Sequence, residues 1–119
     1  MDFGRWTGLT AEEISLQFPT IWREWRSSPF RAKIPGGESL LDVQARAARW
    51  LAQVQRDGPG TTVAFTHESV IKSLICLGQV DMSGIYRSSV VPNCSVHLVQ
   101  GHSLRNGTLP ITRIFGVAG

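Results

Sequence analysis

Residues 61–69 read Thr-Thr-Val-Ala-Phe-Thr-His-Glu-Ser, and this stretch decides the predicted fold. Its first six residues form a short run that is rich in strand-favouring residue types and follows a glycine. This pattern predicts a buried strand of a parallel sheet over residues 61–66. Residues 69–77 place apolar side chains at helical spacing and end before Gly78, which predicts a helix with a glycine at its end. His67 therefore lies where a predicted strand gives way to a helix.

The position of His67 is the most informative feature for function. Ligands of open α/β sheets bind at the carboxyl ends of strands, and the free N–H groups at the start of a helix attract anions. A histidine at such a junction can hold a phosphate oxygen or stabilise a charged transition state. The position alone also fits a histidine that forms a local hydrogen bond at a strand end, so the residues themselves leave both interpretations open.

Upstream of this junction the sequence predicts three helices. Thr10 and Glu13 form a capping-box pattern at the start of the first helix. Pro19 cannot continue that helix but suits the first turn of a second one. The third begins at Ser39, with Asp42 at the third helical position. It carries one apolar stripe of six side chains: Leu40, Val43, Ala47, Trp50, Leu51 and Val54.

Two strand-like runs, at residues 95–99 and 109–115, follow the helices, with the turn signal Asn106-Gly107 between them. Helices followed by alternating strand and helix favour an α/β layer fold. The 119 residues show no repeat or linker, so we expect residues 1–119 to form a single domain.

The composition excludes several classes of protein. Hydrophobic residues make up 42% of the chain and charged residues 18%, which excludes a disordered chain. No stretch approaches the ~20 apolar residues of a membrane span, and no secretory signal is visible. Cys76 and Cys94 are too few for a disulfide scaffold and predict reduced, buried thiols in a cytoplasmic protein. The histidines and cysteines show no zinc-ligand spacing.

The charge balance points to an anionic ligand. Twelve Lys and Arg against nine Asp and Glu give a net charge of +3. This fits a phosphate ester or a nucleic acid, and it equally fits a solvated basic face. The four tryptophans suggest base stacking, but no nucleic-acid-binding motif is present, so nucleic acid is the less favoured partner. The basic residues of the first third are Arg5, Arg23, Arg26, Arg31 and Lys33.

Four segments, in order, resemble the histidine phosphatase superfamily, the phosphoglycerate-mutase-like proteins. Residues 65–74, Phe-Thr-His-Glu-Ser-Val-Ile-Lys-Ser-Leu, resemble its second-histidine motif. Residues 2–8, Asp-Phe-Gly-Arg-Trp-Thr-Gly, look like its Phe-Gly-x-Trp-x-Gly segment. Residues 35–39, Pro-Gly-Gly-Glu-Ser, followed by Asp42-Val43 and Arg46, look like its Gly-Glu-Ser helix start. Residues 92–96, Pro-Asn-Cys-Ser-Val, are similar to a later strand that carries a small polar residue. The amino-acid sequences of these segments most resemble those of bacterial α-ribazole and broad-specificity phosphatases.

The resemblance implies a three-layer open sheet with helices on both faces, and phosphomonoester hydrolysis through a phosphohistidine without metal or cofactor. His67 would be the second, catalytic histidine that binds the phosphate, together with the backbone amide of Glu68. Trp22, Arg26 and Glu38 would belong to a substrate cap over the pocket of a small phosphorylated substrate. From the residues alone, the tryptophan equally fits a core position, and Glu38 fits charge complementarity at a helix start.

The sequence also departs from the family pattern, because it contains no Arg-His-Gly nucleophile motif. Its histidines are His67, His97 and His102, and the last two come too late to be that nucleophile. The resemblance places the nucleophile, the pocket arginines and the general acid upstream of residues 2–8. We therefore expect residues 1–119 to be the C-terminal portion of the fold, without its N-terminal strand.

Two consequences follow from this expectation. The chain alone would be inactive as a phosphatase, and the alternative function is a truncated remnant that binds anions or a partner chain. The strand predicted at residues 61–66 would lose a neighbour, so we expect self-association through an exposed sheet edge. The residues do not separate a phosphatase from a mutase, and they do not specify the phosphate ester.

Overall fold

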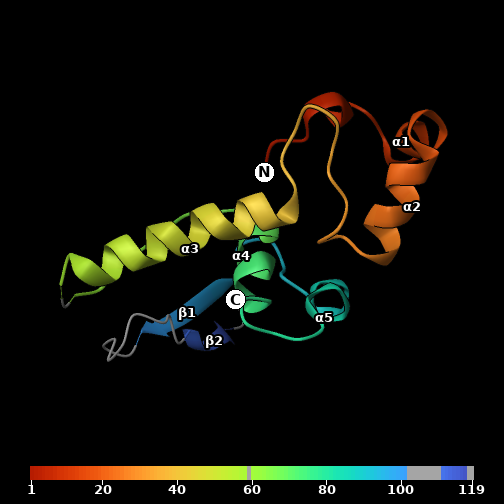
Figure 1. Ribbon diagram of the computed structural model, residues 1–119. Coiled ribbons are helices and arrows are strands. Elements are labelled where there is room, and N and C mark those ends of the chain that lie inside the picture. The colour runs from red at the N-terminus through yellow and green to blue at the C-terminus, as the bar shows by residue number, and fades with distance from the viewer. Residues whose placement is uncertain (59, 102–110, 118–119) are drawn as a thin grey trace.

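A computed structural model of the chain describes residues 1–58, 60–101 and 111–117 (Figure 1). Within these residues the chain is mostly helical and ends in a β-hairpin-like pair of strands. The elements in chain order are a 3-10 helix at Gly4–Trp6, α1 (Ala11–Gln17), α2 (Pro19–Ser27), α3 (Leu40–Arg56), α4 (Glu68–Ile75), α5 (Met82–Ser88), β1 (Val96–Gly101) and β2 (Ile111–Val117).

The predicted helix starts are confirmed. The Thr10 hydroxyl accepts the Glu13 N–H at 3.2 Å, and the Glu13 carboxylate accepts the Thr10 N–H at 2.7 Å, which completes a capping box at α1. Ser39 and Asp42 form the same reciprocal pair at the start of α3. Pro19 is the first residue of α2, where its missing N–H costs no helical hydrogen bond.

The apolar core consists of three small clusters in the described part of the chain. The first is built on Trp6, Ile14 and Ile34, the second on Phe30, Leu40 and Cys76, and the third on Ala47, Leu51 and Leu74. The predicted stripe of α3 is therefore largely buried. Trp50 is the exception: it is 44% exposed and does not belong to the cluster in which α3 packs against Leu74 of α4.

Packing of α4 on α3 fixes the position of His67, the residue that precedes α4. Leu74 packs against Ala47 and Leu51 of α3. The buried Gln44 amide of α3 donates a hydrogen bond to the Ser73 carbonyl at 2.7 Å. α4 ends earlier than predicted: its last residue is Ile75 and its C-cap is Cys76, so the glycine cap predicted at Gly78 is wrong by two residues. Gly78 ends the turn that follows, at φ +77°, a left-handed conformation that glycine accepts without strain.

The buried parallel strand predicted at residues 61–66 is wrong for this structure. Residues 61–67 have no regular secondary structure, and the side chains of Val63 and Phe65 are 75% and 98% exposed. A strand forms only when its backbone groups pair with a neighbour. In the described residues the strands pair only with each other, so residues 61–66 have no partner.

The sheet of the described residues is the two-stranded antiparallel pair of β1 and β2, so it shows no three-layer arrangement. Its register runs from Val96 opposite Val117 to Gln100 opposite Arg113. The strand-like runs predicted at residues 95–99 and 109–115 are thus confirmed with shifted ends. The turn predicted at Asn106-Gly107 lies outside the described residues.

The prediction of two buried thiols holds for one cysteine. Cys76 is free and buried, whereas Cys94 is free and exposed. Cys94 lies in the turn before β1 and adopts φ +60°. The turn directs this residue toward solvent, although its neighbours in the sequence are apolar, so the prediction for Cys94 is wrong.

Candidate functional site

His67 is the N-cap residue of α4 and has an exposed side chain. Its backbone is extended, with φ −114° and ψ 158°. Its carbonyl accepts the N–H groups of Val70 and Ile71 at 3.0 and 3.2 Å, which begins the helix. Its ring makes no capping hydrogen bond, so the imidazole is available to a ligand in front of the helix.

The start of α4 differs from the starts of α1, α3 and α5. Those helices are capped by the side chains of Thr10, Ser39 and Asp81 respectively. No side chain caps the first turn of α4. Uncapped N–H groups at a helix start carry partial positive charge, and an anion can satisfy them. The exposed imidazole and these amides therefore form one polar surface that suits a phosphate group.

The carboxylate of Glu68 pairs with Lys72, one turn further along α4. The Lys72 ammonium lies 3.1 Å from Glu68 Oε1 and 4.7 Å from the centre of the Tyr86 ring. The Lys72 side chain is only 11% exposed, so a nearly buried cation lies in the helix that follows His67. Burial raises the pKa of the Tyr86 phenol, which stays neutral beside this cation. The paired carboxylate leaves the Glu68 amide as the group suited to an anion.

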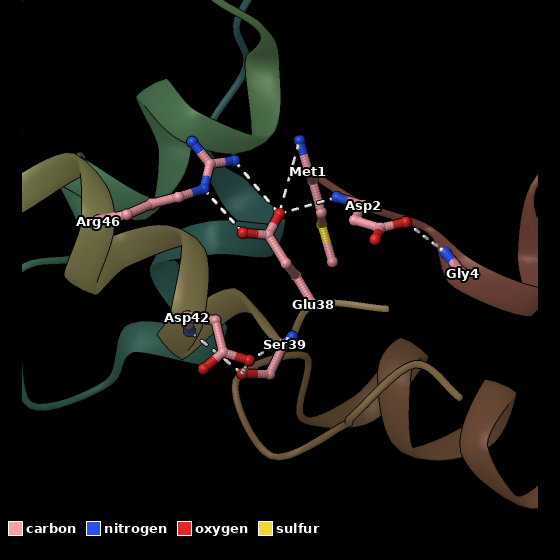
Figure 2. Close-up of polar contacts among 7 residues, drawn as sticks. All are labelled: Met1, Asp2, Gly4, Glu38, Ser39, Asp42 and Arg46. Carbon is pink, nitrogen blue, oxygen red and sulfur yellow. Dashed lines mark hydrogen bonds and ion pairs between the residues drawn. The ribbon is translucent and has the colours of Figure 1, made fainter. Parts of the chain in front are cut away.

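The carboxylate of Glu38 is held by several donors (Figure 2). Arg46 donates to both of its oxygens, at 2.7 and 3.2 Å, and the Asp2 N–H donates at 2.8 Å. The Met1 ammonium lies 3.9 Å away. The hydrogen bond from Arg46 is the main cause that lowers the pKa of the Glu38 carboxyl. Glu38 thus ties the N-terminal segment to α3, and its contact with substrate stays a prediction.

Trp22 and Arg26 lie together on α2. The Arg26 guanidinium carbon is 5.9 Å from the centre of the Trp22 ring, a cation–π distance. Trp22 also lines a concave pocket of about 320 Å³, whose walls include Phe3, Trp6, Leu9, Ile14 and Trp25. In the described residues no hydrogen bond or ion pair joins Trp22, Arg26 or Glu38 to His67.

Two further residues lie beside these groups, and the sequence analysis did not predict their contacts. Lys72 is the nearly buried cation of α4, and its spacing of four residues from Glu68 is the signal that predicts an ion pair. Arg46 belongs to the segment that resembles the family's Gly-Glu-Ser helix start, but no local pattern predicts its pairing with Glu38. Of the other histidines, His97 lies on β1 with Nε2 3.0 Å from the Ser95 hydroxyl, and His102 lies outside the described residues.

Two other features, a metal centre and a membrane-spanning helix, have no counterpart in the described residues. No group of three or more His, Cys, Asp or Glu side chains there is placed to hold a metal ion. Among the helices that the structure describes, none has the length and apolar character needed to cross a membrane.

The profile of the histidine phosphatase superfamily (branch 1) matches residues 1–108. The chain belongs to this superfamily. It is 30% identical over 113 residues to a protein named phosphoserine phosphatase 1 from Hydrogenobacter thermophilus, and the alignment covers 93% of this chain and 53% of that protein. The chain therefore spans about half the length of this relative. No solved structure matches the chain significantly.

Membership confirms the resemblance that rests on the four segments. The superfamily has an α/β fold, so the predicted fold class holds at that level. The matched residues include the whole of α4 and the residue before it, so His67 lies inside the region that the family profile covers.

Proposed function

We propose that residues 1–119 carry the phosphate-binding part of a phosphomonoesterase active site, with His67 as the phosphate-stabilising histidine. One observation carries this proposal: an exposed histidine precedes the uncapped helix α4 in a chain of the histidine phosphatase superfamily. Phosphoryl transfer depends mainly on positioning and on stabilising charge on the phosphoryl oxygens. An imidazole and free amides at one helix start supply both the positioning of the phosphoryl group and the stabilisation of its charge.

The proposed reaction has two steps. A histidine nitrogen attacks phosphorus, the bond from phosphorus to the ester oxygen breaks, and the leaving alcohol takes a proton from a general acid that, like the nucleophile, comes from other residues. Water then attacks the phosphorus of the phosphohistidine and gives a proton back to that group, the bond from phosphorus to nitrogen breaks, and inorganic phosphate and the free histidine are released. His67 and the amide of Glu68 bind the phosphoryl oxygens in both steps. Residues 1–119 contain no Arg-His-Gly, so in this proposal the nucleophile comes from other residues.

The substrate in this proposal is a small phosphate ester. Arg26 adds positive charge beside the aromatic pocket that Trp22 lines, and Glu38 is fixed as a carboxylate by Arg46. We assign these cap residues to the part of the substrate beyond its phosphate. The name of the relative makes phosphoserine the first ester to assay. The proposal also includes a three-layer sheet in which residues 61–66 become a strand when a neighbouring strand is supplied.

A chimera tests the proposal. An N-terminal segment that supplies an Arg-His-Gly motif is fused ahead of residue 1, and phosphate release from phosphoserine is measured. We expect turnover, and we expect His67→Ala to lower kcat by about 100- to 1000-fold, the usual effect of removing one group that stabilises transition-state charge. His97→Ala is the matched control and should leave turnover near that of the parent.

A second candidate function is a non-catalytic remnant that binds anions or a partner chain. Residues 1–119 contain no Arg-His-Gly, so no phosphohistidine of the family type forms within them, and the anion site at His67 is the part that this function uses. The two functions give different results in the same experiment. A folded chimera without turnover, whose chain still binds phosphate at His67, would support the remnant. Near-normal turnover of the His67→Ala chimera would refute the catalytic role of His67.

A further inference from the structure

Lys72 of α4 carries its charge almost inside the protein. Its side chain is 11% exposed, although the long stem of a lysine ordinarily takes the ammonium out into water. Tyr86 of α5 covers it: the ring centre lies 4.7 Å from the ammonium, and α5 packs against α4 (Figure 1). Edge-to-face contacts with Trp25 and Phe30, at 6.5 and 5.7 Å between ring centres, hold the Tyr86 ring in turn. The packing therefore keeps this cation beside the helix.

One carboxylate balances the charge of Lys72. The ammonium donates a hydrogen bond to Glu68 Oε1 at 3.1 Å, and among the described residues Lys72 forms no other ion pair. A nearly buried cation is costly unless it is paired, so the position of Lys72 also fixes its partner. The Glu68 side chain is 59% exposed, and water alone could solvate it. The pair therefore selects one position for a carboxylate that would otherwise be free to move.

The position of this carboxylate matters because Glu68 is the first residue of α4. Helical side chains lean toward the N-terminus of their helix, so a free Glu68 carboxylate would reach toward the uncapped amides and the imidazole of His67. The partial positive charge of the helix start attracts a carboxylate as it attracts a ligand anion, and the two anions repel each other. Lys72 instead holds the carboxylate on the flank of α4 that faces α5 and balances its charge.

We propose that Lys72 is a positioning residue for phosphate at the start of α4: it keeps the Glu68 carboxylate beside α5, so that the imidazole of His67 and the free amides meet the phosphate without a competing anion. This inference rests on the proposed function, in which those groups bind the phosphoryl oxygens. Lys72 itself does not touch the phosphate and acts through Glu68. A lysine that acted only by its own charge would attract phosphate equally with and without the Glu68 carboxylate, and this difference distinguishes the two roles.

A double-mutant cycle on the intact chain tests the proposal, with inorganic phosphate as the ligand and the Glu68 and Ser69 amide NMR signals as the readout. Lys72→Met keeps the apolar stem beside Tyr86 and should weaken phosphate affinity about ten-fold while Glu68 is present. In a Glu68→Gln background the same change should weaken affinity about two-fold or less, because no carboxylate is left to compete. Lys72→Arg keeps a cation within reach of Glu68 and should hold affinity within about two-fold of wild type.

Lys33→Met is the matched control, because it removes the same charge from an exposed lysine between α2 and α3 and should leave phosphate affinity unchanged. The amide signals of Ser73 and Leu74 report whether α4 stays folded, and Lys72→Gln is a second uncharged variant that should show the same dependence on Glu68. An equal loss of affinity in both backgrounds, or no loss in either, would overturn the role of Lys72 and leave the phosphate site standing. A wild-type chain without phosphate-dependent shifts at residues 67–69 would instead refute the proposed function, and the role of Lys72 with it.

Discussion

Arg46 binds both carboxylate oxygens of Glu38, from Nε at 2.7 Å and from Nη2 at 3.2 Å (Figure 2). The pair joins the loop before α3 to the second turn of that helix. The same carboxylate accepts the Asp2 N–H, a residue 36 positions away in the sequence. One side chain therefore links three segments: the N-terminus, the loop before the cap and α3.

The first prediction concerns this link. Glu38→Gln removes the charge of the carboxylate while keeping its size, and we expect a loss of about 1 kcal/mol in the free energy of unfolding, since the pair is partly exposed to water. Urea denaturation followed by circular dichroism measures it. Glu24→Gln, an exposed carboxylate of α2, is the control and should change stability by less than half of that. Equal effects would show that the link contributes nothing specific.

The second prediction is the pH dependence of the same link. Because the pKa of Glu38 is lower in the folded chain than its ordinary value of 4.5, protonation favours the unfolded chain. The stabilisation is complete above about pH 5 and is lost as the pH falls through the folded pKa. The stability difference between wild type and Glu38→Gln should therefore shrink between pH 5 and pH 3. A difference that stays constant over this range would contradict the lowered pKa.

The third prediction separates the two thiols. Cys94 is exposed, whereas Cys76 is buried and donates a hydrogen bond to the Met82 carbonyl at 3.3 Å. Burial also raises the pKa of the Cys76 thiol, so less reactive thiolate is present near neutral pH. An aromatic disulfide reagent should modify one thiol per native chain quickly and the second only after unfolding. Cys94→Ser should abolish the fast reaction, and a fast reaction in that variant would place Cys76 at the surface.

The helix starts were predictable because their signals are local. Thr10, Ser39 and Pro19 act within three residues of their own positions, through hydrogen bonds and backbone angles that the sequence specifies directly. Whether residues 61–66 form a strand cannot be decided from such local signals. Their composition favours a strand, but pairing depends on a neighbour elsewhere, and the described residues offer none.

The candidate site likewise has one part that the local sequence predicts and one part that depends on how the elements pack. His67 could be placed at a helix start from its neighbours in the sequence, and the structure puts it there. The pairing of Glu38 with Arg46 and the burial of Lys72 against Tyr86 depend on which elements pack together. Such contacts between α4 and α5, or between a loop and α3, leave no periodic pattern to read.

The fourth prediction tests His67 in the chain as it stands. Phosphate added at constant ionic strength should shift the NMR signals of the His67 ring and of the Glu68 and Ser69 amides more than other signals, because an anion satisfies the uncapped start of α4. His67→Ala should weaken the apparent affinity about three- to ten-fold, since one charge-assisted hydrogen bond is worth roughly 1 kcal/mol or more.

A control variant and a contrary result of the phosphate titration distinguish a site at His67 from general attraction of anions. His97→Ala removes a histidine of β1 outside the candidate site and should leave the phosphate titration unchanged. If the largest shifts instead fall on Arg23 and Arg26 of α2, the anion is attracted by a solvated basic face, and the net charge of +3 explains the binding. Shifts centred on residues 67–69, lost in His67→Ala and kept in His97→Ala, require a site at the helix start, because a diffuse field would not distinguish the two histidines.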